Sequence, residues 1–219
     1  MTARKRVGVL ISGRGRNLQS LIRAAQAPDY PAEIVLVISN RAQAQGLEHA
    51  RKAGIPAETI PHKDFPSREA FDAALDAALK RARVELVCLA GFMRLLTPGF
   101  VEQWRDRMLN VHPSLLPAFP GLDTHERALA AGVRFAGCTV HFVRAATDSG
   151  PIVGQAAVPV LPGDTSETLA ARVLEAEHRL YPLALRLAAS GRLKVVDGRV
   201  EVAGHRGPQG ALVNPAGET

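Results

Sequence analysis

Short, continuous hydrophobic runs alternate with segments of helical periodicity along the first half of the chain. The apolar runs lie at 7–11 ("VGVLI"), 33–38 ("EIVLVI") and 85–92 ("ELVCLAGF"). A continuous run is typical of a strand covered on both faces, as in a parallel sheet. Strands that alternate with helices predict a doubly wound α/β fold, with a mostly parallel sheet and a Rossmann-like N-terminal half.

Two helices between and after these strands have clear start signals. In 67–82 the apolar residues recur every four positions on one face, and these residues are Phe71, Leu75 and Leu79. Ser67 is placed to cap that helix at its start. Thr97 followed by Pro98 predicts a second helix that runs to about residue 107.

The second half of the chain is less regular. Residues 113–127 contain three prolines and no periodicity, so we expect a long loop there. A strand is predicted at 137–143, and a further extended segment at 152–160. Asp164 and Glu167 form a capping-box pattern, which predicts that a helix begins at this point.

The C-terminal residues form a separate unit in the pattern. Residues 193–202 ("LKVVDGRVEV") are two short runs around Asp-Gly, which predicts a β-hairpin. From Ala203 the chain is rich in glycine and proline and has little to bury, so we expect a flexible tail. We therefore expect one domain over 1–192, followed by a C-terminal hairpin and flexible tail over 193–219.

Composition narrows the class of protein. The 219 residues are 47% hydrophobic and 22% charged, which suits a globular α/β domain of ordinary composition. The apolar run after the basic start ends at Ser12, too short for a signal peptide, and no run approaches a membrane span. Cys88 and Cys138 lie in apolar runs without metal-ligand spacing, so we expect reduced, buried thiols. These features predict a cytoplasmic protein that uses neither a metal nor a membrane.

Charge adds a preference for acidic ligands. The formal net charge is +6 and the isoelectric point is near 9.9. Such a balance favours phosphates and carboxylates. The arginines are scattered along the chain and form no continuous run, so we expect small-molecule substrates and no nucleic-acid partner. The sequence is compatible with a monomer or a homodimer.

The glycine turn "SGRGRN" at 12–17 lies between a predicted strand and a predicted helix. This arrangement directs backbone N–H groups and the positive end of the helix dipole at one point, where a phosphate binds well. The dinucleotide fingerprint needs a third glycine where Leu18 stands, and an acidic residue where Asn40 and Arg41 follow the second strand. NAD is therefore disfavoured. Binding of NADP stays open because of Arg41. The alternative that this is only a tight turn that tolerates glycine, with no bound phosphate, also stays open.

A polar pair is predicted at the end of a strand in "MLNVHPSLLPAFPG", residues 108–121. Asn110 and His112 leave the same face of an extended chain, and Pro113 ends the strand. An amide N–H stabilises an oxyanion, and an imidazole moves protons. Asp148, in a turn beyond the next strand, is the leading candidate to orient the imidazole. Without a serine or cysteine nucleophile, this set of residues favours direct transfer to an incoming amine.

Several motifs together carry a family resemblance. "SGRGRNLQ", "LAGFMRLL", "LNVHPSLLPAFPG", "HFV", "DSGP" and "AEHRLYP" occur in this order between about residues 5 and 192. They closely resemble the phosphoribosylglycinamide formyltransferases of the 10-formyltetrahydrofolate-dependent superfamily. "HPSLLP" with an asparagine two residues earlier is highly specific for that superfamily, whereas the glycine turn alone is not. The resemblance implies transfer of a formyl group from 10-formyltetrahydrofolate, the co-substrate, to the amine of glycinamide ribonucleotide in purine biosynthesis.

The resemblance also assigns residues to roles, position by position. It implies a catalytic trio of Asn110, His112 and Asp148. The residues implied for the ribonucleotide are Gly15, Arg16, Asn17 and Glu177. The residues implied for the folate are Arg68, Met93, Arg94, Leu95, Leu96, Asn110, Arg144 and Asp148. Two simpler alternatives stay open: 93–96 as plain hydrophobic core, and Glu177 as an exposed helix carboxylate.

The chain departs from the family pattern at three positions, and three rival functions stay open. Arg16 stands where the family typically has a small hydroxyl residue, Arg144 begins a loop that is usually more acidic, and Ser149 replaces a small residue beside Asp148. A methionyl-tRNA formyltransferase is expected to add a large domain after the catalytic one, and a formyltetrahydrofolate hydrolase one before it. An NADP-binding module is the rival from another class.

Overall fold

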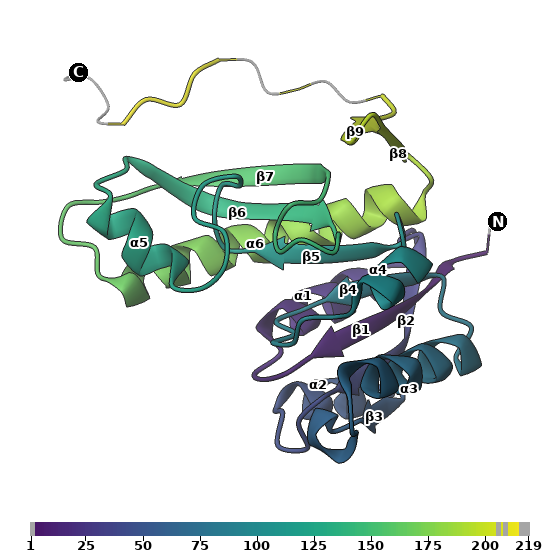
Figure 1. Ribbon diagram of the computed structural model, residues 1–219. Helices are drawn as coiled ribbons and strands as arrows, with labels where there is room; N and C mark the ends of the chain where they lie inside the picture. The colour runs from purple at the N-terminus through teal and green to yellow at the C-terminus, as the bar shows by residue number, and fades with distance from the viewer. Residues whose placement is uncertain (1–2, 205–206, 208–209, 215–219) are drawn as a thin grey trace.

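Seven strands form one large sheet in the computed structural model, which describes residues 3–204, 207 and 210–214. The strand order is β3-β2-β1-β4-β5-β6-β7, with β1 to β5 parallel and with β6 and β7 antiparallel to their neighbours (Figure 1). This confirms the predicted doubly wound α/β fold. The strands are β1 (Lys5–Ile11), β2 (Ala32–Ser39), β3 (Ala57–Thr59), β4 (Leu86–Leu89), β5 (Met108–His112), β6 (Phe135–Phe142) and β7 (Ile152–Pro159).

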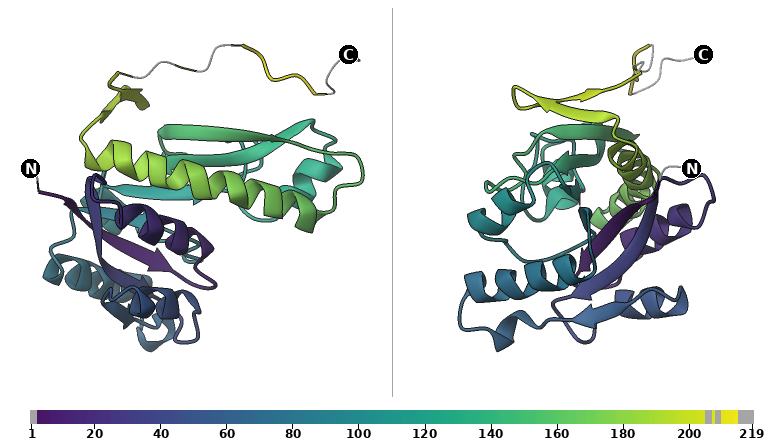
Figure 2. Two further views of the ribbon diagram at one scale, coloured as in Figure 1. Left: turned by 180° about the vertical axis from the view of Figure 1, so that it is seen from behind. Right: turned by 90° about the vertical axis from the view of Figure 1, so that its right-hand side faces the viewer.

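Helices cover both faces of the sheet (Figure 2). One hydrophobic core lies under α1, α2, α5 and α6, and a second lies under α3 and α4. Val9 and Leu10, adjacent in β1, belong to opposite cores, so the continuous apolar run is covered on both faces as predicted. The helices are α1 (Arg16–Ala25), α2 (Gly46–Lys52), α3 (Arg68–Arg81), α4 (Pro98–Gln103), α5 (Thr124–Ala130) and α6 (Ser166–Ala189), with a short 3₁₀ turn η1 (His62–Asp64).

The two cysteines are free and buried, as the sequence predicts. Burial raises the pKa of both the Cys88 and the Cys138 thiol to about 12. Both thiols therefore stay protonated at neutral pH and are poor nucleophiles. Among the described helices, none combines the length and the apolar character that a membrane crossing requires.

The N-caps of α3 and α4 lie where the sequence predicts them. The Ser67 side chain accepts a hydrogen bond from Ala70 N and caps α3 as expected, and Thr97 caps α4 by accepting from Phe100 N. The predicted helix to about 107 is too long, because α4 ends at Gln103. Asp106 has a positive φ of 55°, and a left-handed residue cannot continue a right-handed helix.

The predicted loop at 113–127 is also too long. The structure ends this loop at Asp123, and α5 begins at Thr124. The helix has only seven residues, too few to establish periodicity in the sequence. Its burial is confined to Thr124 and Ala128, one turn apart, and neither is a large hydrophobic residue.

The predicted capping box at Asp164 and Glu167 is wrong by one position. Thr165 is the N-cap of α6: its side chain accepts from Thr168 N, and the Thr168 side chain accepts from Thr165 N. Asp164 instead accepts from Leu161 N at 2.7 Å and pairs with Arg172 at 2.7 Å. Threonine serves at both positions of the box because its hydroxyl both donates and accepts.

The predicted hairpin is present as β8 (Leu193–Val196) and β9 (Arg199–Val202), which pair antiparallel in a separate small sheet. About half of the predicted flexible tail from Ala203 lies outside the described residues. Within the described part, the Asn214 side-chain amide donates to Arg134 O at 2.6 Å, close to where β6 begins. The division at residue 192 stays a prediction.

Candidate active site

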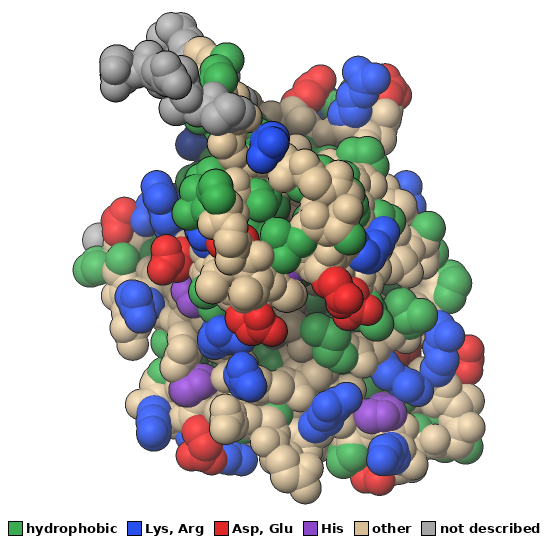
Figure 3. All heavy atoms as spheres, turned by 90° about the vertical axis from the view of Figure 1, so that its left-hand side faces the viewer, with side chains coloured by type: hydrophobic (Ala, Val, Ile, Leu, Met, Phe, Trp, Pro, Cys, Tyr) green, Lys and Arg blue, Asp and Glu red, His purple; other side chains and the backbone are tan. Residues whose placement is uncertain are grey.

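The carboxyl ends of the parallel strands meet at one edge of the sheet. From β1 the sheet grows in one direction through β2 and β3, and in the opposite direction through β4 and β5. The strand order therefore reverses between β1 and β4. Ligands of open α/β sheets bind at such a point. Figure 3 views the molecule from the side toward which β1 and β5 point, and Lys and Arg side chains (blue) are spread over the lower part of this face.

Two polar side chains leave the same side of β5 at this edge. β5 ends at His112 as predicted, and the register pairs Asn110 with His141 and His112 with Thr139 of β6. Directly paired residues of neighbouring strands share a face of the sheet. Alternation along β5 sends Leu109 to the opposite side, where it packs in the core under α6. One face of β5 therefore stabilises the fold and the other carries the polar pair.

The His112 ring is held between two acceptors. Its Nδ1 lies 3.4 Å from Oδ2 of Asp148, and its Nε2 lies 3.0 Å from the carbonyl oxygen of Phe119. The side chains of His112 and Asp148 are only 7% and 9% exposed. Only a doubly protonated ring can donate at both nitrogens, so this arrangement offers the imidazolium a partner at each end. The contact predicted between His112 and Asp148 is present.

Asp148 also holds the loop that follows β5. Its Oδ2 accepts a hydrogen bond from Gly121 N at 2.8 Å. The residue has a φ of 52°, in the left-handed region that aspartate tolerates better than most residues. The turn between β6 and β7 therefore presents one carboxylate both to His112 and to the backbone of the 113–123 loop.

His141 joins this cluster, although the sequence did not identify it as a candidate site residue. Its Nε2 lies 3.3 Å from Nδ2 of Asn110 and 3.8 Å from Oδ1 of Asp148. Burial lowers the pKa of His141. A neutral His141 that donates Nδ1–H to Phe142 O, at 3.0 Å, leaves Nε2 to accept from Asn110. Asn110 then keeps one amide hydrogen free. The pairing of Asn110 with His141 in the β5–β6 register is the signal that could have identified His141 as part of the site.

The first part of the 113–123 loop is tied to the antiparallel strands. The Thr139 hydroxyl donates to Ser114 O at 2.7 Å and accepts from Leu116 N at 3.0 Å. Gln155 of β7 adds a bond from its side-chain amide to Leu116 O at 2.8 Å. These contacts fix the loop where it leaves β5 and bring its later residues over His112.

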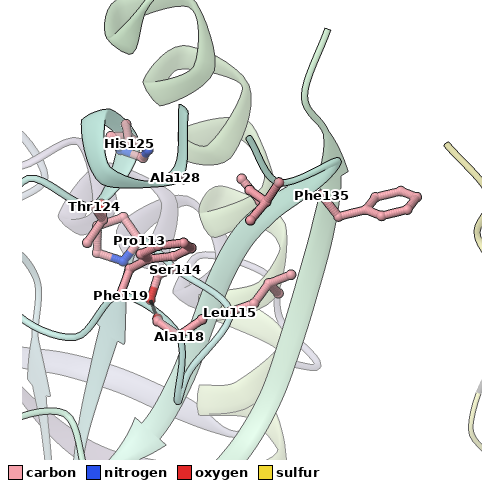
Figure 4. Close-up of a pocket in the computed structure, with 11 residues that line it drawn as sticks. Pro113, Ser114, Leu115, Ala118, Phe119, Thr124, His125, Ala128 and Phe135 are labelled. Atoms are coloured by element: carbon pink, nitrogen blue, oxygen red, sulfur yellow. Dashed lines mark hydrogen bonds between the residues drawn. The ribbon is translucent and has the colours of Figure 1, made fainter. Parts of the chain in front are cut away.

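A cavity of about 110 Å³ lies behind this loop (Figure 4). It is bounded by Pro113 and Phe119 of the loop, His125 of α5 and Phe135 of β6. Small-molecule sites usually measure about 300–1,000 Å³, so this space is too small for a folate or a ribonucleotide. We therefore assign neither reactant to it.

The glycine turn at the start of α1 is close-packed. Gly15 is the N-cap of α1 with a φ of 73°, and a Cβ there would lie 2.6 Å from Cα of Gly46 in α2. Gly46 N also donates to Gly13 O at 3.0 Å. Packing alone therefore requires glycine at position 15. A Cβ on Gly13 would meet nothing within 4 Å, so the turn has an open side, and the first N–H groups of α1 have no partner within their own helix.

Asn17 and Glu177 meet next to this turn. Asn17 Nδ2 donates to Oε2 of Glu177 at 2.6 Å, and Oδ1 of Asn17 is buried without a partner among the described residues. Glu177 is buried, so the alternative of an exposed helix carboxylate is wrong. Burial raises the pKa of Glu177, against the lowering effects of the Asn17 hydrogen bond and the Arg16 charge. The Arg16 side chain itself is exposed.

The four residues after β4 divide between surface and core. Met93 and Leu95 are each 62% exposed, whereas Leu96 is buried in the core under α3 and α4. Plain core is therefore correct for Leu96 and wrong for Met93 and Leu95. Arg94 has a buried Nε without a partner in the described part of the chain. The loop thus offers apolar surface beside an unsatisfied polar atom.

In the described structure, neither of the two remaining arginines forms a side-chain hydrogen bond or an ion pair with Asn110, His112 or Asp148. Arg68 is exposed in the first turn of α3. The guanidinium of Arg144 pairs with Asp106 and donates to Val143 O at 3.0 Å. Its charge is therefore already neutralised by a neighbouring carboxylate, and the folate-binding role of both arginines stays a prediction.

Comparisons with known proteins agree with this architecture. Residues 5–185 match the family described as Formyl transferase. The chain is 42% identical to a phosphoribosylglycinamide formyltransferase of Haemophilus influenzae, over 96% of this chain and 99% of that protein. It is 52% identical to the crystal structure of glycinamide ribonucleotide transformylase 1 from Symbiobacterium toebii, with a TM-score of 0.90 over 92% of this chain and 95% of that one.

Similarity extends to much longer proteins. The chain is 59% identical, over 88% of its length, to the trifunctional purine biosynthetic protein adenosine-3 of Drosophila pseudoobscura pseudoobscura. It spans only 14% of that protein. The likeness to the trifunctional protein therefore concerns a single segment of it.

Proposed function

This chain belongs to the formyl transferase family, and on that premise we propose that it transfers the formyl group of 10-formyltetrahydrofolate to the amine of glycinamide ribonucleotide in purine biosynthesis. The observation that carries the proposal is the buried cluster of Asn110, His112 and Asp148 at the same sheet edge as the glycine turn. The reaction takes place in the cytoplasm, between small molecules and without a metal.

The ribonucleotide phosphate binds at the turn formed by Gly15, Arg16 and Asn17. The open side of the turn, the first N–H groups of α1 and the exposed Arg16 side chain favour an anion there. Glu177 and the unpartnered Oδ1 of Asn17 are acceptors suited to ribose hydroxyls. Arg16 takes the place of a smaller residue and adds charge at the phosphate.

The folate binds against the loop after β4. Its flat, partly apolar ring system needs both an apolar surface and polar partners at its edge, and the exposed Met93 and Leu95 beside the unsatisfied Nε of Arg94 fit that need. Leu96 anchors the loop in the core. Arg68 faces the carboxylates of the folate tail, and Arg144 contributes through its backbone because Asp106 occupies its guanidinium.

Asn110 stabilises the charge that develops when the amine attacks the formyl carbon. Its Nδ2 has one hydrogen directed at His141 and one free for the carbonyl oxygen of the formyl group. Because His141 fixes the amide, the donor is oriented before the reaction begins. Such preorganised donors are worth about 3 kcal/mol of barrier.

His112 moves the protons, and Asp148 orients it. A bond forms between the amine nitrogen and the formyl carbon, and the bond from that carbon to N10 breaks. His112 gives one proton to the departing N10 and takes one from the amine, so its own protonation state is unchanged over a turnover. Its Nε2 contact with Phe119 O must open for this exchange, since that nitrogen is otherwise occupied.

A spectroscopic assay tests the proposal. The purified chain is mixed with a 10-formylfolate, and deformylation is followed with and without glycinamide ribonucleotide. We expect deformylation only when the ribonucleotide is present, together with formation of its N-formyl product. Deformylation by water alone would assign a hydrolase, and no reaction in either case would reject formyl transfer.

A further inference from the structure

A buried hydrogen-bond bridge joins the glycine turn to the loop after β4. Ser12, which directly follows β1, is 4% exposed. Its hydroxyl oxygen lies 2.7 Å from Met93 N and 2.6 Å from Oδ1 of Asn40. Ser12 and Met93 both lie in motifs that carry the family resemblance, but neither the resemblance nor the catalytic cluster assigns a role to Ser12. It links the two segments to which the proposed function assigns the two substrates.

The direction of the hydrogen bonds is fixed by chemistry. Met93 N–H can only donate, and the Ser12 hydroxyl has a single proton. Ser12 therefore accepts from Met93 and gives its own proton to Asn40. Asn40 is 1% exposed, and its Nδ2 faces Nδ1 of His62 at 3.3 Å. Asn40 thus sets the rotation of the Ser12 hydroxyl and with it the position of the lone pair that receives Met93.

Ser12 holds the loop after β4 at two points. In addition to the side-chain bond, Ser12 N donates to Gly91 O at 3.1 Å. The glycine turn has its own separate support, because Gly46 N donates to Gly13 O at 3.0 Å. Removal of the Ser12 hydroxyl therefore affects the loop of Met93 much more than the turn.

We propose that Ser12 is a positioning residue for the folate: its hydroxyl, oriented by Asn40, fixes the backbone of Met93 and so the surface against which the folate lies. This inference rests on the proposed function for the identity of the ligand. Its consequence is selective. Loss of the hydroxyl leaves the partly buried N–H of Met93 without this acceptor, and the loop relieves that cost by shifting.

Ser12→Ala tests the inference, with Ser39→Ala as the matched control. Ser39 is 0% exposed at the carboxyl end of the neighbouring strand, and its hydroxyl donates to Arg41 O at 2.8 Å and accepts from Arg41 N at 3.1 Å. Both serines lose one donor and one acceptor bond on substitution, so their costs in unfolding free energy are similar. Only Ser12 touches the loop of Met93.

We expect Ser12→Ala to raise both the KM for the 10-formylfolate and its Kd by calorimetry about tenfold, from the lost hydrogen bond to Met93 N, while the KM for glycinamide ribonucleotide is unchanged. Ser39→Ala leaves both KM values unchanged, and Ser12→Thr, which keeps the hydroxyl, retains most of the folate affinity. Binding is measured well below each melting temperature, so that reduced stability does not enter.

Two results overturn the inference while the proposed function stands. In the first, the wild-type chain transfers the formyl group, and the Ser12→Ala variant binds the 10-formylfolate with unchanged affinity. In the second, Ser12→Ala raises the KM for the 10-formylfolate and the KM for glycinamide ribonucleotide equally, which would indicate general damage to the site. A wild-type chain that neither binds a 10-formylfolate nor transfers formyl overturns the proposed function and this inference with it.

Discussion

Nδ1 of His112 faces Oδ2 of Asp148 at 3.4 Å, at the junction of a β5 strand end and a left-handed turn after β6. The same carboxylate oxygen accepts from Gly121 N at 2.8 Å. Asp148 therefore couples the orientation of the imidazole to the position of the loop above it, and a change at Asp148 affects both.

Asp148→Asn removes the charge and keeps the shape. We expect kcat to fall on the order of 100-fold or more, because the neutral amide no longer offers the His112 ring a charged acceptor to orient it. The amide oxygen still accepts from Gly121, so the melting temperature changes little. Asp197→Asn, at a left-handed position in the exposed β8–β9 turn, is the control and retains full activity. Near-normal turnover in Asp148→Asn would remove Asp148 from the catalytic mechanism.

Asn110→Ala removes the donor for the developing oxyanion. We expect kcat to fall about 100-fold, corresponding to about 3 kcal/mol of barrier, with a smaller effect on either KM. Single-turnover kinetics isolate the chemical step from product release. Asn214→Ala, which loses an amide near the start of β6, serves as the control. A defect confined to KM would show that Asn110 binds substrate without stabilising the transition state.

Burial lowers the pKa of His141, and this predicts that the free energy of unfolding depends on pH. Between the ordinary histidine pKa of 6.5 and the lowered value, the unfolded chain binds a proton that the folded chain does not. The free energy of unfolding therefore decreases as the pH falls through that window. In His141→Phe this loss of melting temperature on acidification is smaller, and kcat at neutral pH falls about tenfold because Asn110 loses its fixed partner.

His125→Phe separates the effect on acid sensitivity from the effect on kcat. Burial also lowers the pKa of His125, so its replacement likewise reduces the acid sensitivity of the melting temperature. His125 lines the small cavity and contacts neither Asn110 nor Asp148 by a hydrogen bond or an ion pair in the described structure. kcat is therefore retained in His125→Phe. Equal losses of kcat in the two variants would contradict a specific role for His141.

Local sequence signals predicted the elements whose causes are local. The end of β5 follows from Pro113, the start of α3 from the Ser67 cap, and the β8–β9 hairpin from an Asp-Gly pair. The ends of α4 and of the 113–123 loop depend on left-handed residues and on burial of small side chains, which leave no periodic pattern. Those boundaries were therefore wrong.

The same distinction applies to the site. The Asn110 and His112 pair could be predicted from strand alternation alone, and the glycine turn from its position after a strand. His141 joins the cluster only through the β5–β6 register, and Ser12 reaches Met93 only because β1 and β4 are neighbours in the sheet. Such long-range relationships are set by topology, and no short segment of sequence contains them.

Glu177→Gln is expected to increase stability at neutral pH and to weaken binding of the ribonucleotide. Burial raises the pKa of Glu177 above its ordinary value of 4.5. At a pH between 4.5 and the raised pKa of the folded chain, the folded chain therefore holds a proton that the unfolded chain has lost. The stabilising contribution of the protonated form is complete below 4.5 and is lost as the pH rises through the folded pKa. At neutral pH the buried carboxylate is therefore destabilising, and glutamine removes its charge while it can still accept from Asn17.

We accordingly expect Glu177→Gln to raise the melting temperature at neutral pH by roughly 2–4 °C, the shift that about 1 kcal/mol produces in a chain of this size, and to leave it unchanged at pH 4. The KM for glycinamide ribonucleotide rises about tenfold, since a charged acceptor becomes a neutral one. The exposed neighbour Glu175→Gln changes neither quantity. A Glu177→Gln variant that is less stable at neutral pH would mean that the carboxylate is needed for the fold, because its charge would then contribute more through Asn17 and Arg16 than its burial costs.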